Sequence, residues 1–284
     1  HEVWLLDHDW PRAAFLAARG LLLEENGRQE RIPVRATAEP AAIATAELIL
    51  FCVKSGGASS SLAVIAPFLS PASLLIAFQN GIGHLEPLKR LVPADRRAAA
   101  VTSQGATLIA PGRIRYGGRG ATLLGFLDPP GPLTRERAFR VAEAFTDAGI
   151  PATLDEDIAE AIWHKLLVNA GINALTALYN CPNGRLAQDP QLKEQLTRAV
   201  LEAAAVARAL GIEVGDDPVG AALSVCRATA DNISSMLQDV RRQRPTEIDA
   251  INGAVVAEAH RLEIPVPVNE GLVQAIKAKE LEFQ

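Results

Sequence analysis

The stretch DIAEAIWHKLLVNAGINALTALYN, residues 157 to 180, is apolar on nearly every side once its first turns are passed. A helix of this composition is expected to be buried. Lys165, Asn169 and Asn173 follow one another at intervals of four residues, so they form one polar stripe along the helix. Burying such side chains without partners costs several kcal/mol, which leaves two interpretations: the stripe lines a polar ligand site, or it forms a small solvated face. In a ligand site, desolvation would lower the pKa of Lys165 and make it a better proton donor near neutral pH.

The chain follows a different pattern on each side of residue 154. Before it, short β-branched or apolar runs alternate with helical stretches, as in a parallel sheet flanked by helices. We expect strands at residues 3–7, 47–53, 73–78, 98–103 and 121–125, helices at 12–19, 59–68, 84–91 and 134–148, and a short extended piece at 150–154. After it, long helical segments are separated by turn-forming sequences such as CPNG at 181–184 and IPVP at 264–267. The sequence therefore predicts a Rossmann-type α/β nucleotide-binding domain over residues 1–154 and an all-helical substrate and catalytic domain over residues 155–284.

The composition excludes several classes of protein. Across 284 residues the formal net charge is -5, which leaves no excess of Lys and Arg for binding nucleic acid. Apolar runs such as residues 48–53 are far shorter than the roughly 20 residues of a membrane-spanning helix. The three cysteines form no paired spacing, as expected of reduced thiols, and the five histidines show no spacing typical of metal ligands. We therefore expect a cytoplasmic protein that binds a small molecule and has no bound metal, nucleic acid partner or membrane span.

Polar residues stand where three of the expected strands end. Asp7 follows the apolar part of HEVWLLDHD, residues 1–9, at a position where a carboxylate can bond the ribose of a dinucleotide. An aspartate in a turn or at a helix cap would have the same sequence pattern. Lys54 and Asn80 follow the next two strands, at the edge where open α/β sheets bind ligands. The alternatives are a solvated lysine and a tight Asn80-Gly81 turn. A glycine-rich phosphate loop should precede Asp7 by about 20 residues, so we expect it upstream of His1 in a longer protein.

A second polar cluster lies near the C-terminus, in NISSMLQD at residues 232–239 and TEIDAING at residues 246–253. Asn232 and Ser235 are spaced by one helical turn. Thr246 can cap a helix in which Glu247 occupies the first turn. A negative charge there stabilises the helix N-terminus, and physical chemistry alone favours this structural role of Glu247 over a functional one.

Three stretches together resemble the ketopantoate reductases, also called 2-dehydropantoate 2-reductases. They are WHKLLVNAGIN at residues 163–173, NCPNG at 180–184, and NISSMLQDVR with TEIDAING between 232 and 253. The resemblance extends from His1 to the C-terminus. It implies reduction of ketopantoate to (R)-pantoate with NADPH, the step that leads to pantothenate and coenzyme A.

The resemblance also implies roles for individual residues. Lys165 would be the general acid that protonates the ketone oxygen and stabilises its developing negative charge. Glu247 falls on a position of both the catalytic and the cofactor site. The implied substrate contacts are Asn169, Asn173, Asn183, Asn232 and Ser235. The implied cofactor contacts are Lys54, Asn80 and Ala106, to which the strand-end argument adds Asp7.

Two departures from the family pattern bear on the cofactor. The glycine fingerprint and first strand are not in this chain, so no residue can be named for the pyrophosphate. Many relatives have an arginine after the second strand, for the 2'-phosphate of NADPH, whereas this chain has Asp7-His8-Asp9. A carboxylate there favours NADH, so NADP is the family expectation and NAD an alternative. Two other functions stay open, a reductase of another 2-keto acid and an NADP-binding sensor without turnover, and a homodimer is one of the open oligomeric states.

Overall fold

The computed structural model describes residues 2–118 and 120–283, which divide into two compact units. The first unit contains residues 1–51, 60–78 and 89–156. The second contains residues 157–284 together with two short segments from earlier in the chain, residues 52–59 and 79–88.

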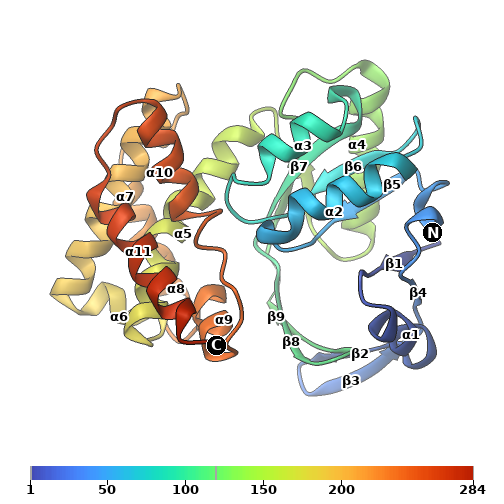
Figure 1. Ribbon diagram of the computed structural model, residues 1–284, viewed down its shortest axis with the longest axis horizontal. Helices are drawn as coiled ribbons and strands as arrows, with labels where there is room; N and C mark the ends of the chain where they lie inside the picture. Colours follow the sequence, from blue (N-terminus) through green and yellow to red (C-terminus); the bar gives the residue numbers. More distant parts are fainter. Residues whose placement is uncertain (1, 119, 284) are drawn as a thin grey trace. The chain divides into compact units, whose positions relative to one another are not determined.

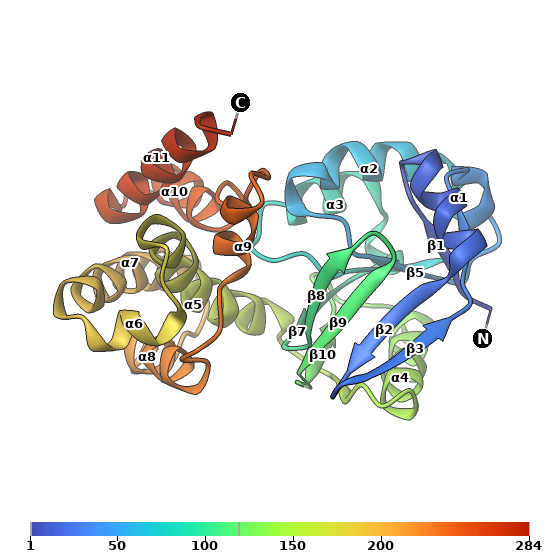
Figure 2. The same ribbon diagram turned by 90° about the horizontal axis from the view of Figure 1, so that it is seen from below.

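The first unit is built on a five-stranded sheet with the order β11-β10-β7-β6-β5. Its strands are β5 (Leu48–Phe51), β6 (Leu74–Ala77), β7 (Arg97–Thr102), β10 (Thr122–Gly125) and β11 (Ala152–Leu154). β5, β6 and β7 are parallel, whereas β10 runs antiparallel to β7. β6 is buried at all four positions, as expected of a parallel strand covered on both faces. Figure 2 shows the two covering helices, α2 (Ala58–Ile65) and α4 (Pro132–Asp147), on opposite faces of this sheet.

Two smaller sheets complete the first unit. β1 (Trp4–Leu6) pairs in parallel with β4 (Arg35–Thr37), and α1 (Trp10–Arg19) follows β1. The other sheet has the order β3-β2-β9-β8. Its strands are β2 (Leu21–Glu25), β3 (Arg28–Ile32), β8 (Gly105–Ala110) and β9 (Arg113–Gly118). Asn26 and Gly27 both have positive φ in the β2–β3 turn, as a two-residue hairpin requires.

The second unit is helical, and α5 (Ile158–Tyr179) runs through its middle (Figure 1). The other long helices are α7 (Pro190–Ala209), α8 (Pro218–Ala228), α10 (Asn252–Arg261) and α11 (Pro267–Leu281), and the short ones are α6 (Asn183–Gln188) and α9 (Ser235–Arg241). The short helix α3 (Leu85–Leu91) begins in the second unit and ends in the first. A short 3-10 helix lies at Ser55–Gly57 in the second unit, and three more lie in the first unit, at Pro40–Ile43, Ala66–Phe68 and Ala94–Arg96. α5 contacts α7, α8, α9 and α11, which explains why its sequence is apolar on nearly every side.

Local sequence sets both ends of α5. The Asp157 carboxylate accepts a hydrogen bond from the backbone N–H of Glu160 at 3.3 Å and so caps the first turn. At the other end Asn180 has a φ of 48°, the left-handed conformation that commonly terminates helices. Gly171 lies at the contact with α7, where an added Cβ would stand 2.6 Å from Val200 Cγ2.

The predicted fold class is confirmed: a Rossmann-like sheet with flanking helices precedes a helical C-terminal part. The prediction missed the strands of the four-stranded sheet. One of them, β3, is exposed at every position and has no apolar alternation to detect. Among the described residues, no helix is both long and apolar enough to cross a membrane.

Candidate active site

The polar stripe of α5 runs from a half-buried to a buried position. Lys165 and Asn169 are partly exposed, and Asn173 is 6% exposed. Desolvation lowers the pKa of Lys165, although the negative charge of Glu247 acts in the opposite direction. The lysine is therefore a group that can release a proton more readily than an ordinary surface lysine.

Glu247 is held by two residues from the short segments that follow β5 and β6. Its Oε1 accepts a hydrogen bond from the Ser55 backbone N–H at 3.2 Å and lies 3.1 Å from the Ser55 hydroxyl. Its Oε2 accepts from the Asn80 side-chain amide at 3.0 Å. The carboxylate is thus fixed at a point to which both strand-end segments contribute.

The expectation that Glu247 sits in the first turn of a helix capped by Thr246 is wrong. α10 begins only at Asn252, and residues 246–251 form a turn. In this turn the backbone N–H groups of Ala250 and Ile251 both bond to the carbonyl oxygen of Glu247. The neighbouring side chains of Ile248 and Ile251 are fully buried, so packing of the turn overrides the local capping signal.

A close backbone approach explains the glycine after Asn80. Gly81 has a φ of +76°, and an added Cβ would lie 1.9 Å from the carbonyl oxygen of Ala250. The next amide, that of Ile82, donates a hydrogen bond to the same oxygen at 3.2 Å. The Asn80-Gly81 pair therefore is a turn, and this turn also brings the Asn80 side chain to Glu247.

Lys54 forms an ion pair that the sequence reasoning missed. Its Nζ lies 2.5 Å from Asp239 Oδ1, and the two side chains are 55% and 10% exposed. Burial raises the pKa of Asp239, an effect that the hydrogen bond and charge of Lys54 oppose. Asp239 is the acidic residue of NISSMLQDVR and follows the buried Met236 and Leu237 on α9, which was a signal that it points inward.

His84 is a second residue that the sequence reasoning missed, because no helical or strand spacing relates it to Glu247. Its side chain is 2% exposed, and within the described residues its Nδ1 has no hydrogen-bond partner. Burial lowers the pKa of His84 to about 4, against the influence of Glu247. The imidazole is therefore neutral at physiological pH and close enough to Glu247 to interact with its charge. The described residues contain no cluster of side chains suited to a metal.

The asparagines beyond α5 are brought together in part. The Asn183 backbone N–H donates to the carbonyl oxygen of Asn232 at 3.0 Å, and its side-chain amide donates to Thr229 Oγ1 at 2.9 Å. Asn183 is 8% exposed, whereas Asn232 and Ser235 are exposed. Asn232 lies before α9, so it does not share a helical turn with Ser235. The residue that caps this helix is Ser234, which accepts from Leu237 N–H at 3.1 Å.

Asp7 and Ala106 lie in the first unit. Asp7 directly follows β1 and accepts hydrogen bonds from the Arg12 guanidinium, including Nε to Oδ2 at 2.5 Å, which lowers the pKa of the carboxyl. The cap of α1 is Asp9, which accepts from Arg12 N–H at 2.8 Å, so Asp7 is not the helix cap. Ala106 is an exposed residue of β8, opposite Tyr116 of β9.

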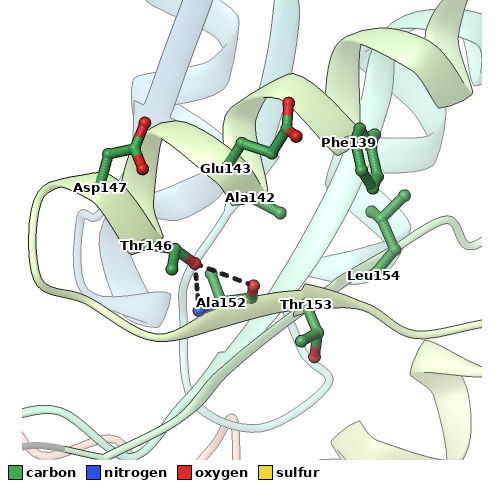
Figure 3. A pocket seen from close by; sticks show the side chains of 8 residues that line it. All are labelled: Phe139, Ala142, Glu143, Thr146, Asp147, Ala152, Thr153 and Leu154. Atoms are coloured by element: carbon green, nitrogen blue, oxygen red, sulfur yellow. Dashed lines mark hydrogen bonds between the residues drawn. The ribbon is translucent and has the colours of Figure 1, made fainter.

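A separate groove lies between α4 and β11, lined by Phe139, Glu143, Asp147 and Leu154 among others (Figure 3). Within this lining Thr146 Oγ1 forms two hydrogen bonds with the backbone of Ala152. The groove contains none of the predicted site residues.

Comparison with known proteins gives matches over both parts of the chain. The family described as "Ketopantoate reductase PanE/ApbA" matches residues 1–129, and "Ketopantoate reductase PanE/ApbA C terminal" matches residues 157–280. A 2-dehydropantoate 2-reductase of Halobacterium salinarum is 35% identical over 97% of this chain and 90% of its own length. One of Vibrio cholerae is 34% identical over 83% of this chain and 78% of its own length.

Solved structures agree with these matches. A ketopantoate reductase from Ralstonia eutropha has a TM-score of 0.90 and 32% identity, with 100% of this chain and 92% of that chain covered. A D-mandelate dehydrogenase in complex with NADH and anilino(oxo)acetate also has a TM-score of 0.90, with the same coverage. At 24% identity, the second likeness shows the fold alone.

Proposed function

This chain belongs to the ketopantoate reductase family, and we propose that it reduces ketopantoate to (R)-pantoate. The observation that carries the proposal is Lys165, a lysine of lowered pKa on a buried helix, under the influence of a carboxylate that Ser55 and Asn80 fix. That arrangement suits a proton donor next to an anchored anionic group. Relatives that carry the name 2-dehydropantoate 2-reductase supply the substrate class.

The residues present fit a nicotinamide dinucleotide. Lys54 offers an exposed ammonium group, and Gly56 and Gly57 beside it have open space where a Cβ would lie, so a ligand can approach the backbone closely. Asn80 and Ala106 are further proposed cofactor contacts. The first unit is the proposed nucleotide-binding domain, with Asp7 at the end of β1 for the adenosine ribose.

The proposed reaction uses Lys165 as its acid. When bound, the reduced nicotinamide supplies a hydride to the keto carbon. Lys165 Nζ donates a proton to the keto oxygen, which becomes the new hydroxyl group, and the neutral amine recovers its proton from solvent. Before transfer, the ammonium charge stabilises the negative charge that develops on this oxygen. The proposed role of Glu247 is to orient the substrate beside the lysine.

The substrate contacts that we propose are amides and hydroxyls, which suit a ligand with a carboxylate, a ketone and a hydroxyl. They are Asn169, Asn173, Asn183, Asn232 and Ser235. We place the reaction in pantothenate biosynthesis, in the cytoplasm.

NADPH is the proposed cofactor. Asp7 alone would repel a 2'-phosphate, but the bidentate contact with Arg12 offsets its charge and puts a guanidinium at the same strand end. Arg12 is exposed at 43% of its side chain, so it can turn toward a phosphate. NADH remains the competitor in the test.

The test follows oxidation of NADPH and of NADH with ketopantoate, and with phenylglyoxylate as a 2-keto acid that lacks the hydroxyl group. Turnover of ketopantoate above phenylglyoxylate supports the assignment, and no turnover of ketopantoate with either cofactor refutes it. Lys165→Ala should lower kcat by orders of magnitude, whereas Lys193→Ala, at an exposed lysine of α7, should not change it.

A further inference from the structure

The turn of residues 246–251, which carries Glu247, is attached at its start to the last turns of α11. Glu280 Oε1 accepts two hydrogen bonds from Thr246, one from the backbone N–H at 2.8 Å and one from the hydroxyl at 2.7 Å. The Thr246 hydroxyl oxygen in turn accepts from Ile248 N–H at 3.2 Å. Glu280 therefore holds Thr246 directly, and the Thr246 hydroxyl holds Ile248 on the other side of Glu247.

Glu280 makes these contacts as a largely buried anion. Its side chain is 17% exposed, and Lys277 Nζ lies 3.5 Å from its second oxygen. Burial acts to raise the pKa of Glu280, but the hydrogen bonds from Thr246 and the charge of Lys277 outweigh it and lower the pKa. Lys277 also forms an ion pair with Asp249, which follows Glu247 in the turn. α11 therefore contacts the turn at a second point.

The far end of the turn is attached to the helix of Lys165. Asn252 is fully buried, and its side-chain amide donates to the carbonyl oxygen of Ala170 on α5 and to Asn269 Oδ1, both at 3.0 Å. Asn269 is fixed in turn by Glu202 and by the carbonyl oxygen of Ala199. The turn is thus held at both ends: Asn252 attaches it to α5, the helix of Lys165, and Thr246 attaches it to α11.

We propose that Glu280 is a positioning residue of the active site, which acts through Thr246 to hold the Glu247 carboxylate against Ser55 and Asn80. This inference rests on the role proposed above for Glu247. Without Glu280 the turn loses its contact at Thr246 and keeps only the contacts that follow Glu247, at Asp249 and Asn252, so Glu247 spends less time in the orientation that binds substrate. The apparent substrate affinity is then the intrinsic affinity multiplied by the fraction of molecules that remain competent, so it decreases.

The test combines kinetics with a double-mutant cycle. Glu280→Ala should raise the KM for ketopantoate about tenfold and change kcat little. Loss of a hydrogen bond to a charged group changes an equilibrium constant by about a factor of ten. Glu280→Gln keeps an acceptor of the same shape and should restore part of the affinity. In a Glu247→Ala background, Glu280→Ala should cause no further rise, because the residue through which it acts is gone. Glu282→Ala, at an exposed glutamate just after α11, is the matched control.

Hydrogen exchange provides a readout that does not need turnover. The Ser55 amide bonds to Glu247 Oε1, so its exchange should accelerate in Glu280→Ala as it does in Glu247→Ala. If Glu280→Ala folds poorly, Thr246→Val removes the hydroxyl donor and should show a smaller effect of the same kind. Equal rises in KM in both backgrounds, or unchanged Ser55 exchange, would overturn the inference. An enzyme without ketopantoate turnover but with the predicted exchange change would overturn the proposed function alone.

Discussion

His84 should make the stability of the second unit depend on pH between about 6.5 and 4. Burial lowers its pKa from 6.5 to about 4, so in this interval the unfolded chain binds a proton at His84 that the folded chain does not. The free energy of unfolding therefore decreases as the pH falls, and the contribution is fully present only above pH 6.5. At 1.36 kcal/mol per tenfold change in proton affinity, the difference amounts to about 3 kcal/mol.

The measurement compares the protein with its His84→Leu variant in urea at a series of pH values. Leucine has a similar volume, and no hydrogen bond to Nδ1 is lost among the described residues. Fluorescence of the buried Trp163 reports on the second unit once the exposed Trp4 and Trp10 are replaced by phenylalanine. Because carboxyl groups titrate in both proteins, the difference between their free energies of unfolding isolates His84.

That difference should change by about 3 kcal/mol from pH 7 to pH 4, in the direction that favours the variant at low pH. Ile276→Val, at a fully buried position of the same unit without a titratable group, serves as the control and should give a difference that does not change with pH. A difference that stays constant with pH, or that favours the wild type at low pH, refutes the reasoning.

Three further outcomes follow from the charges of the site. First, kcat should decline with rising pH at a pH below 10.5, because the acid form of Lys165 is the donor and its pKa is lowered; a kcat profile without this decline contradicts the role. Second, Glu247→Ala should raise the KM for ketopantoate about tenfold or more, and it should move the decline in kcat to lower pH, because the charge of Glu247 raises the pKa of the lysine. Third, Asp239→Asn should weaken cofactor binding by about three- to tenfold, as measured by titration, because Lys54 loses its ionic partner, while stability stays within about 1 kcal/mol.

The sequence predicted well the elements whose pattern is long or fully buried. The helix expected from residues 157 to 180 is observed as Ile158–Tyr179, since its ends coincide with strong capping residues. β6 was predicted as residues 73–78 and is observed as Leu74–Ala77, since an apolar run of this length fits a buried strand. The exposed strand β3 was missed because its pairing with β2, and not its own composition, makes it a strand.

The contacts of the site could not be derived from local spacing. Glu247 bonds to residues 192 and 167 positions earlier in the chain, and Lys54 pairs with a residue 185 positions later. No helical or strand period relates such positions, so they could be assembled only by the tertiary fold. The same packing displaced the expected helix start at Thr246 to Asn252, because burial of Ile248 and Ile251 outweighs a favourable cap.

The short segments 52–59 and 79–88 have a consequence for the order in which the protein can fold. A fragment that starts at residue 157 would contain the helix of Lys165 and the turn of Glu247, but it would lack Ser55 and Asn80, the groups that hold the carboxylate. During synthesis these two segments leave the ribosome long before their partners exist. Closing loops of this length is slow, so we expect the helices to pack first. The hydrogen bonds of the Glu247 carboxylate with Ser55 and Asn80 are then expected to form last. Catalytic competence would then mark completion of folding, and a protein with its secondary structure formed would still be inactive.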